Sequence, residues 1–151
     1  SCIDSDVHAG TARLPDLPGQ LADLCRHQIA PLRDACRHRG LPVILTTDHG
    51  TIRIKHPVKV IGDRNTNTNL RYKQGKNLNF NPKEVFLVKN PGEAKLPLQH
   101  LSSSFIFAKP DDFFVYPNNY NHFVNHYNDT FQHGGISLEE MIVPFATYLP
   151  K

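Results

Sequence analysis

Several features that define whole classes of protein are missing from this sequence. No apolar stretch approaches the roughly 18 residues needed to span a membrane, and no signal peptide opens the chain. Cysteine is scarce: the chain has Cys2, Cys25 and Cys36. Three is an odd number, and no two of them form a CxxC pair. This usage excludes a disulfide framework and a zinc knuckle. The sequence therefore predicts a cytoplasmic protein with reduced thiols and no membrane segment.

Acidic residues are also scarce in the middle of the chain. Residues 51–100 contain ten lysines and arginines but three acidic residues, a net charge of +7, whereas the rest of the chain carries −4. A solvated, lysine-rich surface is one explanation of such a segment. Here the basic residues alternate with asparagine and threonine, whose side chains form hydrogen bonds. The pattern therefore favours a surface that faces a polyanion.

The apolar spacing predicts a helix followed by a strand in the first third of the chain. Apolar residues approximate the 3.6-residue helical period over residues 18–39, and Gly40 is a typical helix stop. Pro31 predicts a kink or a division into two shorter helices. Residues 42–47 are apolar and β-branched, which predicts a strand and, with the helix, one unit of a parallel sheet.

The later elements are expected to be shorter. Alternating apolar and basic residues predict half-exposed strands, and other segments are assigned by composition. Strands are expected at 52–55, 58–60, 85–88 and 105–108, a helix at 119–129, and a strand or helix broken by Pro144 at 141–149. Asparagine, glycine and proline predict loops at 64–69, 75–77 and 116–120.

The phrase VILTTDHG at residues 43–50 carries the first candidate site residues. Asp48 and His49 end the predicted strand at the carboxyl edge of a sheet, where α/β proteins place their sites. On an extended strand these two side chains would point to opposite faces. Both can therefore reach one metal ion only if the chain turns sharply, and Gly50 supplies the freedom for that turn.

The phrase QHGGISLEEMIVP at residues 132–144 carries a second candidate. His133 precedes two glycines, which let a backbone approach a ligand closely, and Ser137 begins a capping-box helix start. Aspartate and histidine suit a borderline divalent ion such as zinc. A lone histidine is more often a surface residue, and four others lack any such context: His27, His38, His56 and His100.

These two phrases, with residues 50–78 and FVYPNNYNHF at 114–123, resemble the PglZ domain of the alkaline phosphatase superfamily. The closest resemblance is to the carboxyl-terminal domain of PorX-type response regulators, and it is dense from Pro42 onward. It implies an α/β fold with an alkaline-phosphatase-like parallel sheet and flanking helices. Residues 1–151 would form the carboxyl-terminal part of that domain, with residues 51–130 as a basic inserted cap.

The resemblance also implies a set of metal ligands. Asp48 and His49 would bind one metal, and His133 would bind its neighbour. The second metal is expected to take an Asp-x3-His pair, for which Asp4 and His8 have the right spacing, with Asp6 as the competing carboxylate. Two zinc ions are expected, with manganese as the alternative, and such a pair clamps an in-line displacement at phosphorus. The nucleophile, a threonine or serine in the family, is expected upstream of Ser1.

The activity implied is hydrolysis of nucleotide phosphodiesters, such as short cyclic or linear oligonucleotides. Arginine binds phosphate in bidentate fashion, asparagine adds polar contacts, and tyrosine stacks on bases. The expected substrate-binding residues are Arg64, Arg71, Asn67, Tyr72, Tyr120 and His122. His122 and His126 lie four apart on a predicted helix, so they form either an aromatic wall or a further metal-binding pair.

Two other interpretations remain open at the sequence level. The chain could be a non-catalytic PglZ-like module that binds a partner protein or nucleic acid through its basic face, in which case it would need no metal. It could also be a sulfatase or phosphate mutase, although a C-x-P-x-R motif for a sulfatase is missing. The expected partners are an oligonucleotide substrate, an upstream receiver domain of a two-component response regulator, and a second copy of the chain.

Overall fold

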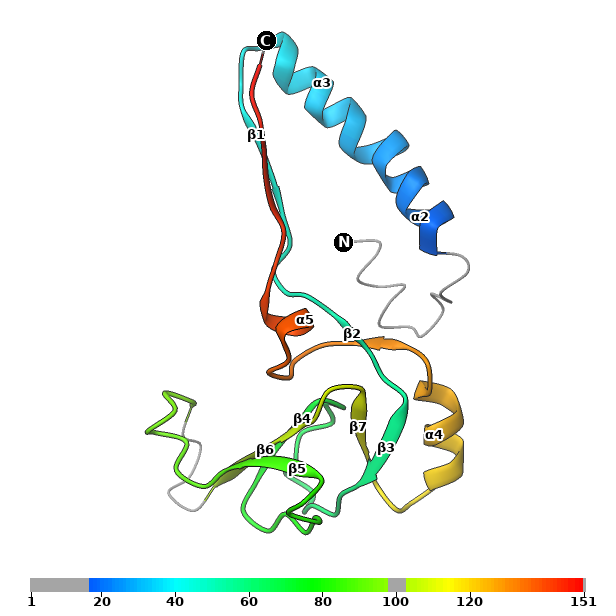
Figure 1. Ribbon diagram of the computed structural model, residues 1–151, viewed down its shortest axis with the longest axis vertical. Coiled ribbons are helices and arrows are strands. Elements are labelled where there is room, and N and C mark those ends of the chain that lie inside the picture. The colour runs from blue at the N-terminus through cyan, green and yellow to red at the C-terminus, as the bar shows by residue number, and fades with distance from the viewer. Residues whose placement is uncertain (1–16, 98–102, 151) are drawn as a thin grey trace.

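The computed structural model describes residues 17–97 and 103–150. A long helical rod opens this part of the chain: α2 (Leu17–Leu24) continues through a π-helical turn, η1 (Cys25–Ile29), into α3 (Ala30–His38). The N–H of Ala30 donates to the carbonyl of Cys25, five residues earlier, directly before Pro31, which has no N–H. The kink predicted at Pro31 thus takes the form of a π-helical turn within one continuous rod (Figure 1).

The rod ends at His38, two residues before Gly40, the predicted stop. Gly40 has a left-handed φ of 67°, and the N–H groups of Gly40 and Leu41 donate to the carbonyls of Arg37 and Cys36, each at 3.0 Å. These bonds satisfy carbonyls that the helix end would otherwise leave exposed. The chain then enters β1 (Val43–Thr46), which confirms the predicted strand.

β1 pairs with β9 (Phe145–Tyr148) in an antiparallel ribbon, with Val43 opposite Tyr148. The parallel neighbour predicted for residues 42–47 is not found among the described residues, because the last residues of the chain return along β1 in the opposite direction. The one parallel pair described joins β3 (His56–Lys59) to β7 (Asp112–Val115). Within residues 17–97 and 103–150, the prediction of a parallel sheet therefore holds for that pair alone.

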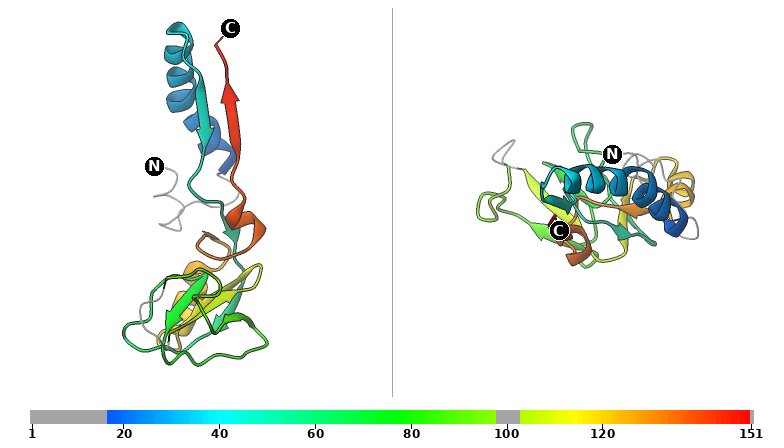
Figure 2. Two further views of the ribbon diagram at one scale, coloured as in Figure 1. Left: turned by 90° about the vertical axis from the view of Figure 1, so that its left-hand side faces the viewer. Right: turned by 90° about the horizontal axis from the view of Figure 1, so that it is seen from above.

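A lobe of short strands lies at one end of the molecule, and the ribbon and rod extend away from it (Figures 1 and 2). Its elements are β2 (Ile52–Arg53), β4 (Tyr72–Gly75), β5 (Val85–Val88), β6 (Ser104–Ala108), α4 (Tyr120–Tyr127), β8 (Phe131–Gln132) and α5 (Leu138–Met141), together with β3 and β7. β4, β6 and β5 form an antiparallel sheet in that order, and β2 pairs antiparallel with β8. The strands expected at 85–88 and 105–108 and the helix at 119–129 are confirmed, whereas β4, β7 and β8 were not predicted.

The core of the lobe has two apolar clusters that share β7. Successive strand residues point to opposite faces, so Phe113 lies in the cluster of Ile52 and Ile54, whereas Phe114 lies in the cluster of Val58. α4 covers the first of these clusters through partly buried aromatic and aliphatic side chains. The alternating burial predicted for residues 52–60 is confirmed, because the isoleucines and valines are buried and the lysines are exposed.

The rod and the ribbon bury much less. α3 has no buried residue, and the ribbon exposes large apolar side chains such as Ile44 and Phe145, the latter at 70%. A two-stranded ribbon has little stability by itself in water, and a contiguous apolar surface marks a contact site. None of the described helices is both long enough and apolar enough to cross a membrane.

A buried ion pair fastens α5 to the lobe. Nε and Nη2 of Arg71 donate to Oε1 and Oε2 of Glu140, each at 2.9 Å, and both side chains are essentially inaccessible to solvent. Nη1 of Arg71 donates to the backbone carbonyls of Lys109 and Asp112, where the chain enters β7. The pair therefore joins three segments that are distant in sequence.

The carboxylate of Glu140 is kept ionised by its partners. Burial alone would raise its pKa, but the hydrogen bonds and charge of Arg71 oppose this, together with the backbone N–H of Gly135 and the side chain of Ser137. The net result is a pKa below the ordinary value of 4.5. The pair is thus fully charged at neutral pH, and a charge left without its partner in this position would be costly.

Glu140→Gln should lower the free energy of unfolding by about 3–5 kcal/mol at pH 7, because the Arg71 guanidinium would remain buried without its counter-charge. The matched control is Glu139→Gln, the adjacent exposed carboxylate, which should change stability by less than about 0.5 kcal/mol. Denaturant titration of the whole protein measures both. Equal effects of the two variants would contradict the assignment of Glu140 as a buried anchor.

The difference in stability between the wild type and Glu140→Gln should depend on pH. The pKa of Glu140 is depressed in the folded protein, so its contribution is present above the unfolded pKa of about 4.5 and is lost as pH falls through the lower folded-state value. The difference in stability between the wild type and Glu140→Gln should therefore shrink below about pH 4.5.

Candidate functional site

The structure brings the two histidine-bearing phrases together. His49 follows β1 and His133 follows β8, and their rings stack with centroids 3.7 Å apart and planes 11° from parallel. Oδ1 of Asp48 lies 3.7 Å from Nε2 of His49. The chain bends at Asp48, which brings the neighbouring carboxylate and imidazole close together, whereas Gly50, expected to supply the turn, does not have a left-handed φ. Asp48, His49 and His133 form a polar cluster where the ribbon meets the lobe.

The geometry of His49 suits a metal ligand. Nδ1 of His49 lies 3.0 Å from the carbonyl oxygen of Gly50, an acceptor that requires the proton to be on Nδ1. In the neutral ring the lone pair is then on Nε2, which lies 3.7 Å from Oδ1 of Asp48. A histidine whose Nδ1–H is held by a backbone carbonyl is the usual arrangement for Nε2 coordination. The donor set and this tautomer both fit a borderline divalent ion.

The coordination set is partial within the described chain. Residues 17–97 and 103–150 contain no group of three or more His, Cys, Asp or Glu side chains placed to hold a metal ion. Asp4 and His8, expected to bind the second metal, lie outside the described residues, as does Asp6. Asp48, His49 and His133 are thus the part of the predicted ligand set whose positions are known.

Glu140 attaches both histidine loops to α5. Its backbone carbonyl accepts the N–H of Gly50 at 2.9 Å, and its carboxylate Oε1 accepts the N–H of Gly135 at 2.8 Å. Oε2 also accepts the N–H of Ser137 at 3.2 Å. This is the hydrogen bond of the predicted capping box in which the Glu140 side chain binds the N-cap backbone. The residue that neutralises Arg71 therefore also sets the paths of the two loops.

Glycine is required at the two contact points with α5. A Cβ at Gly50 would collide with the backbone carbonyl of Glu139, and one at Gly135 would collide with the carboxylate of Glu140. Neither neighbour can withdraw easily, since the first is backbone and the second is held by Arg71. Close approach of backbones is thus the physical reason for both glycines.

Asn69 supports the His133 loop from the lobe. Its Nδ2 donates to the carbonyl of His133 at 3.3 Å, while its Oδ1 accepts the N–H groups of Arg71 at 2.7 Å and Tyr72 at 3.2 Å. The asparagine therefore fixes the start of β4 and the second loop to one another. No local sequence pattern marks Asn69 or Arg71 as structural residues, because their partners His133 and Glu140 lie far away along the chain.

The structure contradicts the phosphate contact expected of Arg71. The side chain is fully buried, and all three guanidinium nitrogens are occupied by Glu140 and backbone carbonyls. Asn67 is also used structurally, because its amide donates to the carbonyl of Tyr72 and accepts the N–H of Gln74. The charge and polarity of these two residues stabilise the lobe and do not face a substrate.

The other expected substrate residues differ in accessibility. Tyr72 is half-buried with its ring 6.2 Å from those of Phe105 and Phe107, and Tyr120 is half-buried beneath the ammonium of Lys59, which is 5.0 Å from its centroid. Arg64 lies exposed in the predicted loop. His122 is exposed on α4, stacked against His126 at 6.2 Å. Arg64 and His122 therefore remain accessible to a ligand.

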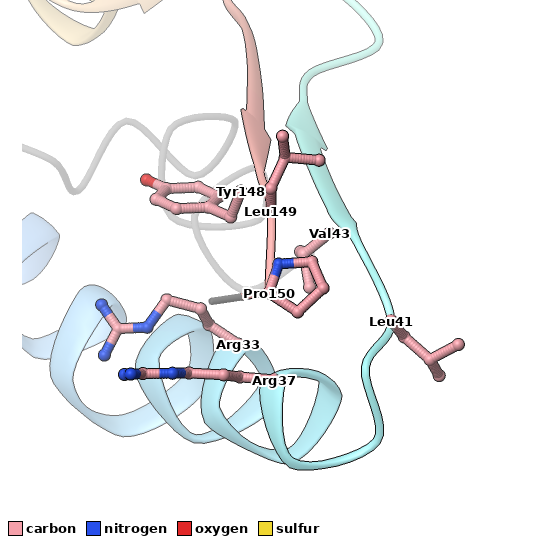
Figure 3. Close-up of a pocket in the computed structure, with 7 residues that line it drawn as sticks. All are labelled: Arg33, Arg37, Leu41, Val43, Tyr148, Leu149 and Pro150. Carbon is pink, nitrogen blue, oxygen red and sulfur yellow. The ribbon is translucent and has the colours of Figure 1, made fainter.

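Asp48, His49 and His133 do not line either of two cavities of interest. One, of about 310 Å³, is formed between α3 and the ribbon, with Arg33 and Arg37 projecting side by side next to Tyr148 (Figure 3). Because Val43 and Tyr148 pair at the end of the ribbon opposite Thr46, this cavity is at the far end of β1 from Asp48. The other, of about 190 Å³, lies in the lobe between β4, β7 and α4.

Gly135→Ala should disturb the site by pushing the new Cβ into the carboxylate of Glu140. We expect a loss of about 1–3 kcal/mol in stability, the usual range for overpacking. The control is Gly19→Ala in α2, where an added Cβ meets nothing within 4 Å and should stabilise the helix slightly. Thermal unfolding of both variants measures this, and an unchanged melting temperature for Gly135→Ala would refute the close contact.

Comparison with known families accounts for almost the whole described chain. Residues 17–148 match the family model described as the BREX system PglZ alkaline phosphatase-like domain. Asp48, His49 and His133 all lie within the matched region. Comparison with curated proteins gives no match. Since the family model covers far more than half of the sequence, the chain belongs to the PglZ family of alkaline phosphatase-like domains.

Proposed function

We propose that the protein is a metal-dependent phosphoric ester hydrolase that acts on nucleotide phosphodiesters, including short cyclic or linear oligonucleotides. The observation that supports it best is the stacked pair of His49 and His133 beside Asp48, in a chain of an alkaline phosphatase-like family. Aspartate and histidine side chains are typical ligands of catalytic zinc, and His49 is oriented by a backbone carbonyl as such ligands are.

Asp48 and His49 would hold one zinc ion and His133 its neighbour, with Asp4 and His8 as proposed further ligands and manganese as the alternative metal. When bound, such a pair supplies Lewis-acid activation of a nucleophile and stabilises the leaving oxygen. The contribution of this chain is to orient the ligands. The Gly50 carbonyl fixes the His49 tautomer, and Glu140 fixes the loops that carry both histidines.

The substrate class is proposed from charge and accessibility. The exposed Arg64 loop belongs to the basic segment, and an exposed arginine can contact a phosphate that is remote from the reacting one. His122 and Tyr120 on α4 are further candidates for substrate contact. A receiver domain of a two-component response regulator is proposed from the family resemblance, and a cytoplasmic location from the scarce, unpaired cysteines. A homodimer completes the proposal.

A non-catalytic module that binds a partner through the basic face is the alternative function. The exposed lysines and the exposed Arg64 would serve that role as well. The two functions differ in what they ask of the histidine cluster, because the binding module needs no metal. Metal content therefore separates them.

The complete protein should purify with about two zinc ions per chain. His133→Ala should reduce both the metal content and the hydrolysis of a small chromogenic phosphodiester, the latter by at least about 100-fold, with little loss of folding. The control is His38→Ala, an exposed histidine at the end of α3. Elemental analysis that finds no transition metal in folded protein, together with equal activity of both variants, would exclude the hydrolase.

Arg64→Ala should raise KM for an oligonucleotide by about tenfold and leave KM for the small ester unchanged, because only the longer substrate has remote phosphates. Activity on the oligonucleotide should also fall more steeply with added salt. Arg26→Ala, an exposed arginine outside the basic segment, is the control. If the ratio of KM for the oligonucleotide to KM for the small ester is the same in Arg64→Ala and Arg26→Ala, oligonucleotides are excluded as substrates. The proposed esterase activity would be unaffected by that result.

A further inference from the structure

The second cavity, of about 190 Å³, lies in the lobe. Its walls are largely apolar and aromatic, with contributions from Leu70, Phe114, Tyr116, Phe123 and Tyr127. Phe123 forms part of the rim, since it is 36% exposed. One charged side chain, that of Lys73, also lines this space.

Lys73 is buried without a counter-charge. The residue is 1% exposed, and its Nζ donates to the carbonyl of Asn67 at 3.0 Å and lies 4.5 Å from the ring centroid of Tyr116. No acidic side chain pairs with it among the described residues. An ammonium has three N–H groups, so the single carbonyl leaves donor capacity unused. Burial also lowers the pKa of Lys73 to about 8.

Such a lysine is costly for the fold, which suggests a role beyond packing. An ammonium removed from water needs compensating hydrogen bonds or an opposite charge, and Arg71, two residues away, has both. Lys73 has a hydrogen bond but no opposite charge among the described residues. A ligand that brings a hydrogen-bond acceptor into the cavity would supply what the lysine needs, and groups of this kind are common at binding sites.

One short segment connects the cavity to the His133 loop. Thr68 and Leu70 line the cavity, and Asn69 between them donates to the carbonyl of His133 at 3.3 Å. One short segment therefore forms a wall of the cavity and a support of the histidine cluster. A ligand in the cavity would lie beside the segment that positions the site.

We propose that this cavity binds the base of a nucleotide substrate, with a carbonyl oxygen of the base accepting a hydrogen bond from Lys73. The aromatic walls suit stacking on a planar ring, and the volume suits one ring system and not a whole nucleotide. A phosphate is a poor occupant, because a single cation in an apolar lining leaves most of its oxygens without donors. The identity of the ring as a nucleobase rests on the proposed function.

The chemistry of Lys73 should make the cavity selective among bases. Lysine only donates hydrogen bonds, so a base that presents a carbonyl oxygen is favoured. Uracil and guanine have such an oxygen, whereas adenine presents an amino group on its outer edge. The cavity should therefore prefer uridine to adenosine.

Binding of nucleosides to the full protein tests this without hydrolysis, because nucleosides have no phosphate. Saturation-transfer NMR and calorimetry with uridine and adenosine should detect binding of uridine. Lys73→Met, which keeps the volume, should weaken uridine binding by about tenfold. Lys59→Met is the matched control, because it also removes an ammonium over a tyrosine ring, but on the exposed surface; it should leave the affinity unchanged.

Phe123→Ala provides a second variant at the partly exposed rim, where folding is less at risk, and should weaken uridine binding through lost stacking. Uridine binding that is undetectable in the wild type, or unchanged in both folded variants, would overturn the proposal. Lys73-dependent uridine binding in a protein without esterase activity would support the base pocket and reject the proposed hydrolase. Esterase activity that is unchanged in both variants, in a protein that does not bind uridine, would support the proposed hydrolase and reject the base pocket.

Discussion

The guanidinium of Arg71 and the carboxylate of Glu140 are both withdrawn from water, and both histidine-bearing loops are attached to this pair. Buried charges are tolerated when each has an opposite charge and its remaining hydrogen bonds are made, and here both conditions hold. Arg71 is anchored at the start of β7, and Glu140 holds the backbone of Gly50 and Gly135. The relative position of His49 and His133 is therefore set from inside the lobe.

Burial divides the basic residues of the middle segment into different roles. Arg71 and Lys73 are buried, so eight of the ten cations remain at least partly accessible against three acids, which reduces the accessible net charge from +7 to +5. Arg71 stabilises the lobe, whereas Lys73 has no anionic partner among the described residues and lines a cavity. The remaining cations, Arg64 among them, can act on a polyanion through long-range attraction.

Local patterns in the sequence predicted the elements that depend on local interactions. The helical period over residues 18–39, the stop at Gly40 and the β-branched runs at 43–46 and 85–88 are all confirmed. β4 and β7 contain glutamine, glycine or aspartate at positions that weaken a strand signal, and they form because β6 and β3 pair with them. Arg71 was misassigned for the same reason, since its partner Glu140 is 69 residues away and charge in a sequence carries no information about burial.

The ribbon can form only late in the synthesis of the chain. The hydroxyl of Thr46 donates to the carbonyl of Pro144, 98 residues later, and β1 has no other partner strand among the described residues. A growing chain emerges amino end first, so Asp48 and His49 leave the ribosome long before α5 and β9 exist. Until then β1 presents open edges that can pair with other chains. A product that ends before α5 would carry the Asp-His pair and still lack the frame that makes it a site.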